Sequence, residues 1–102
     1  MTVQESFDHL VETVRGYNPS ANFDLIRSAF EFADKAHEGQ LRKDNSPFVT
    51  HPLAVAQIVA EELHLDSESI AAALLHDTIE DTAATHEQIA ELFSPTIAIL
   101  VE

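Results

Sequence analysis

Apolar residues recur with a helical spacing along nearly the whole of this chain, and few residues interrupt the pattern. Its 102 residues include only two glycines and four prolines. A β-rich protein of this length needs many tight turns, for which glycine and proline are the usual residues. Apolar positions three and four residues apart instead give each segment one apolar stripe, as in helices that pack together. The sequence therefore predicts an all-α bundle.

The charge and composition limit the classes of protein that this chain can belong to. Eighteen acidic and five basic residues give a formal net charge of −13, yet 45% of the residues are hydrophobic. We expect one soluble, cytoplasmic domain over residues 1–102, with no nucleic-acid partner because phosphate binding needs a basic surface. No apolar run reaches the roughly 18 residues of a membrane span, and no signal peptide opens the chain. Cysteine is absent, which excludes disulfides and thiolate metal sites.

Boundary signals divide the chain into helices and one long loop. Gly16 is expected to end the first helix, and a second helix is expected from residue 22 or 23 to 38, closed by Gly39. Residues 40–50 have no helical period and are read as a connecting loop. The expected helix starts lie at Thr2 with Glu5, Thr50, Asp66 or Ser67, Thr85 with Gln88, and Ser94-Pro95. The phenylalanines at 7, 23, 30, 32 and 93 are expected in the core.

The most distinctive polar residues are His76, Asp77, Glu80 and Asp81, at the end of an otherwise apolar helix. Imidazole and carboxylate together suit a divalent cation such as Zn, Mn, Fe or Co. Consecutive residues cannot both point the same way on a regular helix, so the helix is expected to end or distort at His76-Asp77. The alternative is a helix terminus with solvent-facing acids, where His76 interacts favourably with the helix dipole.

His51 is a second candidate metal ligand. It opens a helix shortly after Arg42 and Lys43, which are the clustered bases of the chain. Taken alone, it would be interpreted as a surface histidine beside a proline. The joint occurrence with His76-Asp77 favours a shared metal site.

Four motifs then occur in order along the chain. They are Ala36-His37-Glu38-Gly39-Gln40, Arg42-Lys43, Thr50 to Ala56, and Ala73 to Thr82. Together they resemble the HD-superfamily hydrolase domain of the RelA/SpoT homologues, the alarmone (p)ppGpp synthetase/hydrolases and their small stand-alone hydrolase relatives. The resemblance covers roughly residues 22 to 101, and it implies an HD-type helical bundle.

The resemblance also implies roles for the motif residues. His51, His76 and Asp77 match three of the family's four ligands for a single Mn²⁺ ion. Glu80 and Asp81 match the acidic pair that orients or activates the attacking water. The implied reaction removes the 3′-pyrophosphate of ppGpp or pppGpp, giving GDP or GTP plus pyrophosphate in the degradation of the stringent-response alarmone.

Arg42 and Lys43 match the basic loop residues that contact the guanine nucleotide in that family. A protein at −13 would repel a polyanionic substrate unless positive charge were concentrated locally, so the pair has a physical reason to be there. The next residues depart from the family pattern. Asn45 can replace a glycine in a left-handed turn, Phe48 lacks the family's phenolic hydroxyl, and Asp44 adds a negative charge near the expected phosphate path.

The family's fourth ligand, a later aspartate, has no match in the sequence. The acids beyond Asp81 are Glu87, Glu91 and Glu102, and none stands in the matching context. The last apolar segment also lacks a stop signal, so we expect a partial HD domain, truncated before its C-terminal helices, with weak metal binding and impaired activity. The residues expected to be exposed at the cut edge are Ile97, Ile99, Leu100 and Val101, with parts of the Ile70–Leu75 helix. From that exposure we expect a homodimer.

Two other functions remain open. One is an HD phosphohydrolase that acts on another nucleotide, and Arg42-Lys43 argues against it. The other is a non-catalytic regulatory HD module of an alarmone synthetase, although the complete set of motif acids and histidines argues against an idle site. The remaining histidines are expected on the surface at positions 9, 64 and 86, whereas His37 is expected to pack or to support the basic loop.

Overall fold

The structure is a computed structural model that describes residues 2–82 and 84–101, without the side chains of Glu80 and Asp81. Within these residues it contains seven helices and no strand, apart from an isolated bridge between Leu41 and Pro47. The helices are α1 (Val3–Tyr17), α2 (Phe23–Ala36), α3 (Thr50–Leu63), α4 (Ser67–Leu75), α5 (Thr78–Asp81), α6 (His86–Leu92) and α7 (Pro95–Val101). The predicted all-α fold is confirmed. Among the described residues no helix is both long and apolar enough to cross a bilayer.

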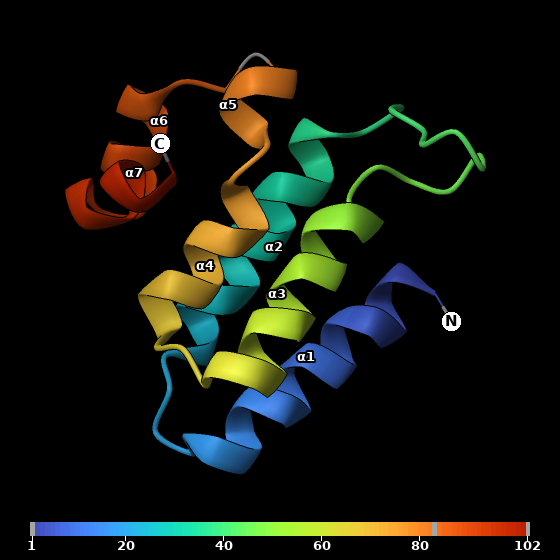
Figure 1. Cartoon of the computed structure of the whole chain (residues 1–102). Helices are drawn as coiled ribbons and strands as arrows, with labels where there is room; N and C mark the ends of the chain where they lie inside the picture. Colours follow the sequence, from blue (N-terminus) through green and yellow to red (C-terminus); the bar gives the residue numbers. More distant parts are fainter. Residues whose placement is uncertain (1, 83, 102) are drawn as a thin grey trace.

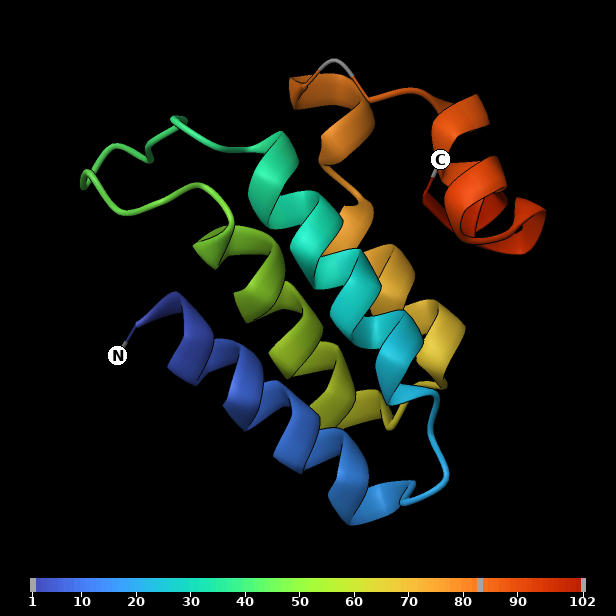
Figure 2. The ribbon, with the colours of Figure 1, turned by 180° about the vertical axis from the view of Figure 1, so that it is seen from behind.

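Helix α4 lies at the centre of the packing. It contacts α2, α3 and α7, while α1 packs on α3 and α6 packs on α7. Figures 1 and 2 show α1 to α4 side by side in one bundle, with α5 at the end where α4 stops and with α6 and α7 beside α4. Every residue from Ile70 to Leu75 is buried except the half-buried Ala73. A short apolar helix is held in place in this way, and its end presents His76 and Asp77.

Most of the predicted caps are present. Thr2 with Glu5 and Thr85 with Gln88 form capping boxes, each with the reciprocal pair of hydrogen bonds. The Asp66 carboxylate accepts a hydrogen bond from the Ser69 backbone N–H at 2.8 Å. Ser94 accepts one from the Ile97 N–H at 3.0 Å. Side-chain acceptors therefore satisfy orphan N–H groups at the starts of these helices.

Three predicted boundaries were wrong. Gly16 lies inside α1, which continues to Tyr17, whose hydroxyl donates to the Leu65 carbonyl at 2.6 Å and anchors the last turn. Helix α2 ends at Ala36, and Gly39 follows in a turn at a φ of 83°. Thr50 does not cap α3: the preceding Val49 already has helical dihedrals, and the Thr50 hydroxyl donates backwards to the Pro47 carbonyl.

The phenylalanines occupy the core and its margin. Phe7 and Phe30 are buried and stacked, with ring centroids 4.4 Å apart. Phe23, Phe32 and Phe93 are half-buried and pack against the core. The Phe32–Phe93 pair meets edge to face at 5.7 Å and joins α2 to the residue after α6.

The C-terminal helix is more enclosed than expected. Ile97 is 1% exposed and Val101 is buried, whereas Ile99 is 67% exposed and Leu100 is also exposed. Positions four residues apart share one helical face, and that face of α7 packs on α4. The expectation that Ile97, Val101 and parts of the Ile70–Leu75 helix would be exposed was therefore wrong. The apolar surface on which the expected homodimer rested is reduced to Ile99 and Leu100.

This packing predicts a large difference between two neighbouring isoleucines. Ile97→Ala is expected to lower the free energy of unfolding by about 2–5 kcal/mol, because it leaves a cavity between α7 and α4. Ile99→Ala, at an exposed position of the same helix, is the matched control and should change it by no more than about 0.5 kcal/mol. Urea denaturation of both variants measures the difference. Equal effects would show that α7 does not pack on α4.

Candidate metal centre and basic loop

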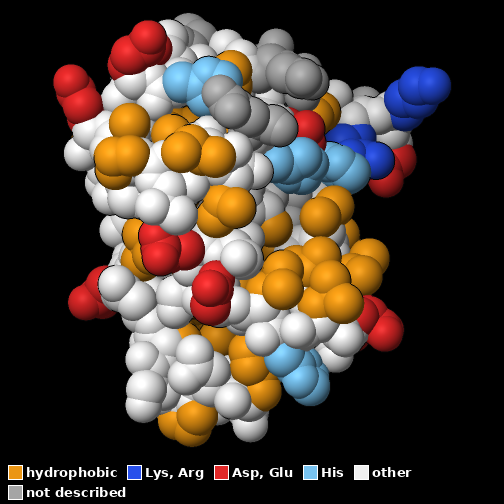
Figure 3. Space-filling model, turned by 60° about the vertical axis from the view of Figure 1, so that its left-hand side comes forward, with side chains coloured by type: hydrophobic (Ala, Val, Ile, Leu, Met, Phe, Trp, Pro, Cys, Tyr) orange, Lys and Arg blue, Asp and Glu red, His pale blue; other side chains and the backbone are white. Residues whose placement is uncertain are grey.

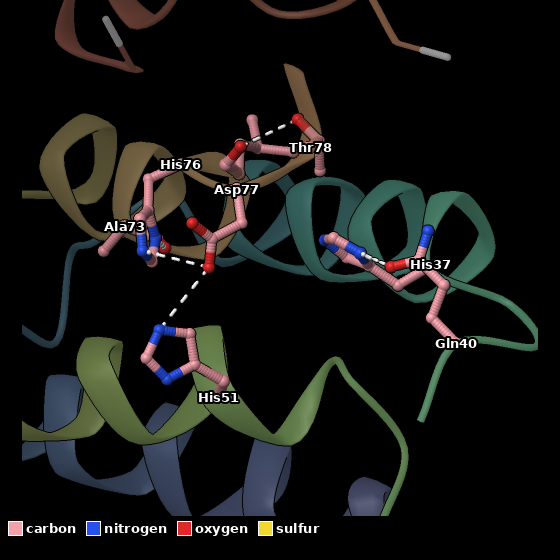
Figure 4. A network of polar contacts seen from close by, with 8 residues as sticks. His37, Gln40, His51, Ala73, His76, Asp77 and Thr78 are labelled. Carbon is pink, nitrogen blue, oxygen red and sulfur yellow. Dashed lines mark hydrogen bonds and ion pairs between the residues drawn. The ribbon is translucent and has the colours of Figure 1, made fainter. Parts of the chain in front are cut away.

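The helix breaks between α4 and α5, as the sequence predicted. Helix α4 ends at Leu75, and His76 and Asp77 form a turn before α5 begins at Thr78. The fully buried Thr78 hydroxyl donates to the Leu75 carbonyl at 2.7 Å, and that bond caps the broken helix end. The break allows two consecutive side chains to point to the same side, which a continuous helix would prevent (Figure 4).

His51, His76 and Asp77 come together at this break. His51 lies in the first turn of α3, and its Nε2 atom is 3.5 Å from Asp77 Oδ2. The Nε2 atom of His76 is 3.2 Å from the same oxygen. One candidate ligand atom from each of the three residues lies within 4.8 Å of the others. Figure 4 shows His51 facing the other two across the space between α3 and α4. The structure thus brings together the three residues that the sequence predicted as metal ligands.

A backbone carbonyl fixes the orientation of His76. Its Nδ1 atom lies 2.6 Å from the Ala73 carbonyl oxygen. A carbonyl can only accept, so Nδ1 carries the hydrogen and Nε2 of the neutral ring presents a lone pair towards Asp77. Two acceptors at 3.2 Å repel one another unless a proton or a cation lies with them. This contact with Ala73 was not predicted from the sequence. The signal that could have indicated it is that Ala73 precedes His76 by three residues at a helix end.

The donor set fits a divalent cation. Two imidazole nitrogens and one carboxylate oxygen are ligands that Mn, Fe, Co and Zn share. Histidine ligands typically donate their second ring N–H to a carbonyl or carboxylate, as His76 does. All three side chains are half-buried, so a ligand could reach them from solvent. In the described part of the chain, no second group of three His, Asp or Glu side chains has metal-binding geometry.

The basic loop, residues 40–49, is a short ordered finger. Its two arms are joined by the Leu41–Pro47 bridge and by the Arg42 N–H, which donates to the Ser46 carbonyl at 2.9 Å. Asn45 adopts the expected left-handed conformation at a φ of 71°. The finger carries an open hollow of about 600 Å³, lined by Leu41, Arg42, Lys43, Asp44 and Phe48. Figure 3 shows Lys and Arg side chains next to histidines on one face of the molecule.

Asp44 is tied into the tip of this loop. Its carboxylate accepts hydrogen bonds from the Ser46 hydroxyl at 2.6 Å and from the Ser46 N–H at 3.0 Å. These bonds hold the pKa of the Asp44 carboxyl below its ordinary value. Its charge therefore lies beside Arg42 and Lys43 in the lining of the hollow.

The other histidines differ in their surroundings. His9 and His64 are exposed, as predicted. His86, at the start of α6, is half-buried and therefore less exposed than the predicted surface position. His37 is buried and stacks on Phe48, consistent with the predicted support of the basic loop.

Glu80 and Asp81 follow Asp77 by three and four residues. Their backbone lies in α5, but their side chains lie outside the described residues. Their assignment as the pair that activates water remains a prediction.

Comparison with known proteins identifies the family. Residues 29–102 match the HD domain family. The chain belongs to the HD domain family. It is 48% identical over 101 residues to a GTP pyrophosphokinase of Myxococcus xanthus, and 44% identical over 101 residues to a probable GTP pyrophosphokinase of Mycobacterium leprae. These alignments cover 95% and 99% of this HD domain chain and 13% of each relative.

A third relative is named for both the synthesis and the hydrolysis of (p)ppGpp. The chain is 46% identical over 102 residues to the bifunctional (p)ppGpp synthase/hydrolase SpoT of Escherichia coli, with 100% of the chain and 14% of SpoT covered. Family and relatives together show an HD domain of the RelA/SpoT type. The chain spans about one-seventh of the length of these relatives.

Proposed function

We propose that this HD domain is a metal-dependent phosphohydrolase that removes the 3′-pyrophosphate of ppGpp or pppGpp. The observation that supports it most is the convergence of His51, His76 and Asp77 within 4.8 Å, close to an ordered loop with two bases. The first feature suits a divalent cation, and the second suits a polyanionic nucleotide. The comparison with SpoT adds further support, because that relative is named as a (p)ppGpp synthase/hydrolase.

The metal would be held by His51, His76 and Asp77, and we propose Mn²⁺. A divalent ion held there would lower the pKa of a water molecule and so supply the nucleophile. Asp77 and the two imidazoles hold their ligand atoms toward one point, and the Ala73 carbonyl keeps the Nδ1 proton of His76 away from it. The fourth ligand of the family has no match in the sequence, so metal affinity should be weak in this chain alone.

Glu80 and Asp81 would orient the attacking water and accept its proton. The water oxygen joins the phosphorus nearest the ribose, the bond from that phosphorus to the 3′ oxygen breaks, and the 3′ oxygen takes up a proton. The products are pyrophosphate and GDP or GTP. A positioned carboxylate of this kind contributes about 10²- to 10⁴-fold to a rate.

Arg42 and Lys43 would hold the nucleotide. They supply local positive charge on a chain whose net charge is −13, and they line one hollow with Phe48. Guanidinium can also stack on a base plane, which ammonium does less well. The loop favours the alarmone over the alternative of another nucleotide substrate.

A substrate panel tests the proposal. The protein of full natural length that contains this HD domain should release pyrophosphate from ppGpp with Mn²⁺, and should leave GTP and dGTP intact. The chain on its own is expected to be far slower. Turnover of dGTP but not ppGpp would support the other-nucleotide alternative. Absence of turnover on the whole panel, with metal bound, would support a regulatory module.

A further inference from the structure

We infer that His37 is a positioning residue that fixes the basic loop to the end of α2 and sets its place relative to His51. The role in nucleotide binding rests on the proposed function, whereas the role in holding the loop does not. His37 follows α2 directly and is 2% exposed. Among the described residues, no other ionisable side chain is as deeply buried.

The burial of this imidazole has a cost that a plain packing residue would avoid. The Nε2 atom of His37 is buried and has no hydrogen-bond partner among the described residues. Burying a polar atom without a partner typically costs about 1–3 kcal/mol. Phenylalanine would fill a similar space without that cost. Histidine is therefore favoured at this position only if its other ring nitrogen, Nδ1, makes a useful contact.

That nitrogen holds the first arm of the loop. The Nδ1 atom of His37 lies 3.1 Å from the Gln40 side-chain oxygen, which Figure 4 shows next to the ring. The Gln40 backbone N–H also donates to the His37 carbonyl at 2.9 Å. One residue at the end of α2 thus fixes both the backbone and the side chain of Gln40, where the basic loop begins.

The face of the same ring holds the second arm. Phe48 stacks on His37 with centroids 4.6 Å apart and an interplanar angle of 29°. The Phe48 N–H donates to the Gln40 carbonyl at 3.0 Å, which closes the base of the loop. His37, Gln40 and Phe48 therefore form a clamp, and Arg42 and Lys43 lie on the finger beyond it.

The clamp continues to the metal centre. The Phe48 carbonyl accepts a hydrogen bond from the His51 N–H at 3.0 Å, and the two rings meet edge to face at 6.3 Å. Phe48 also lines the hollow that contains Arg42 and Lys43. The Phe48 ring thus joins His37 to the hollow and to the first turn of α3. Loss of the His37 stack should loosen the finger while the helices stay folded.

Limited trypsin digestion tests the clamp without any assumption about activity. Arg42 and Lys43 are exposed cleavage sites on the finger, whereas Arg15, Arg27 and Lys35 lie in helices. Cleavage of a folded chain tracks the population of its opened form. His37→Ala and Phe48→Leu should each raise cleavage at the finger by about tenfold, and the double variant should do little more, because the two residues act as one unit. His64→Ala, which removes another stacked histidine far from the loop, is the control and should change nothing.

Kinetics of the full-length protein provide the second measurement. His37→Ala should raise KM for ppGpp and the dissociation constant of GDP by about tenfold, with Mn²⁺ binding unchanged within about twofold. His37→Phe keeps the stack and should recover part of both losses.

If His37→Ala unfolds the protein, the inference is decided by His37→Phe, which must show intermediate finger cleavage and GDP affinity. Cleavage and GDP binding equal to wild type in His37→Phe and in Phe48→Leu would overturn it. A wild-type protein that binds GDP but releases no pyrophosphate would contradict the proposed function and leave the clamp standing.

Discussion

In the full-length protein, Asp77→Asn is expected to weaken Mn²⁺ binding by at least 100-fold and to abolish measurable hydrolysis of ppGpp. Its Oδ2 atom lies within 3.5 Å of both histidine Nε2 atoms, so the substitution removes the negative charge at the point where all three residues meet. Loss of an outer partner of a metal ligand typically costs 10- to 100-fold, and loss of a ligand should cost more. Isothermal titration with Mn²⁺ measures the first effect, and pyrophosphate release measures the second.

Asp34→Asn is the matched control for this substitution. Asp34 is an exposed acid on α2, and its loss changes the net charge by the same amount. It should leave metal affinity and turnover within about twofold, since exposed charges are largely screened. Equal Mn²⁺ affinity in Asp77→Asn and wild type would exclude this carboxylate as a ligand.

Glu80→Gln and Asp81→Asn are expected to separate chemistry from metal binding. Each should lower kcat by about 10²- to 10⁴-fold, because a general base is lost, while Mn²⁺ affinity stays close to wild type. Glu87→Gln, at an exposed position of α6, serves as the control. A decrease of less than tenfold in both variants would argue against their role in activating water. A parallel loss of metal would make them ligands instead.

Local signals in the sequence were sufficient for most of the fold. The capping boxes at Thr2 and Thr85 and the cap at Asp66 depend on residues three positions apart, and all three are present. Two of the errors came where tertiary contacts decide the structure. Tyr17 extends α1 past Gly16 through a hydrogen bond to Leu65, 48 residues away. The burial of Ile97 depends on the packing of α7 against α4, and the spacing of residues within α7 does not predict that contact.

The residues of the candidate site could be predicted from the sequence, but most of the contacts that hold them in place could not. Spacing and residue type singled out His76-Asp77 and required the helix to break there, as it does. The approach of His51 follows from the packing of α3 on α4, which periodicity alone does not align. The contact of His76 with the Ala73 carbonyl and the stack of His37 on Phe48 depend on side-chain orientation, which the sequence does not specify.

Removal and return of metal in the full-length protein tests the central proposal most directly. The protein is stripped with a chelator, Mn²⁺ is added back in steps, and pyrophosphate release from ppGpp is followed at each step. We expect no release from the stripped protein, and a rise to full turnover that saturates at one Mn²⁺ bound per chain. Undiminished turnover in the stripped protein would contradict a metal-dependent hydrolase. So would restoration of turnover by Mn²⁺ in a His51→Ala/His76→Ala variant to the level of wild type.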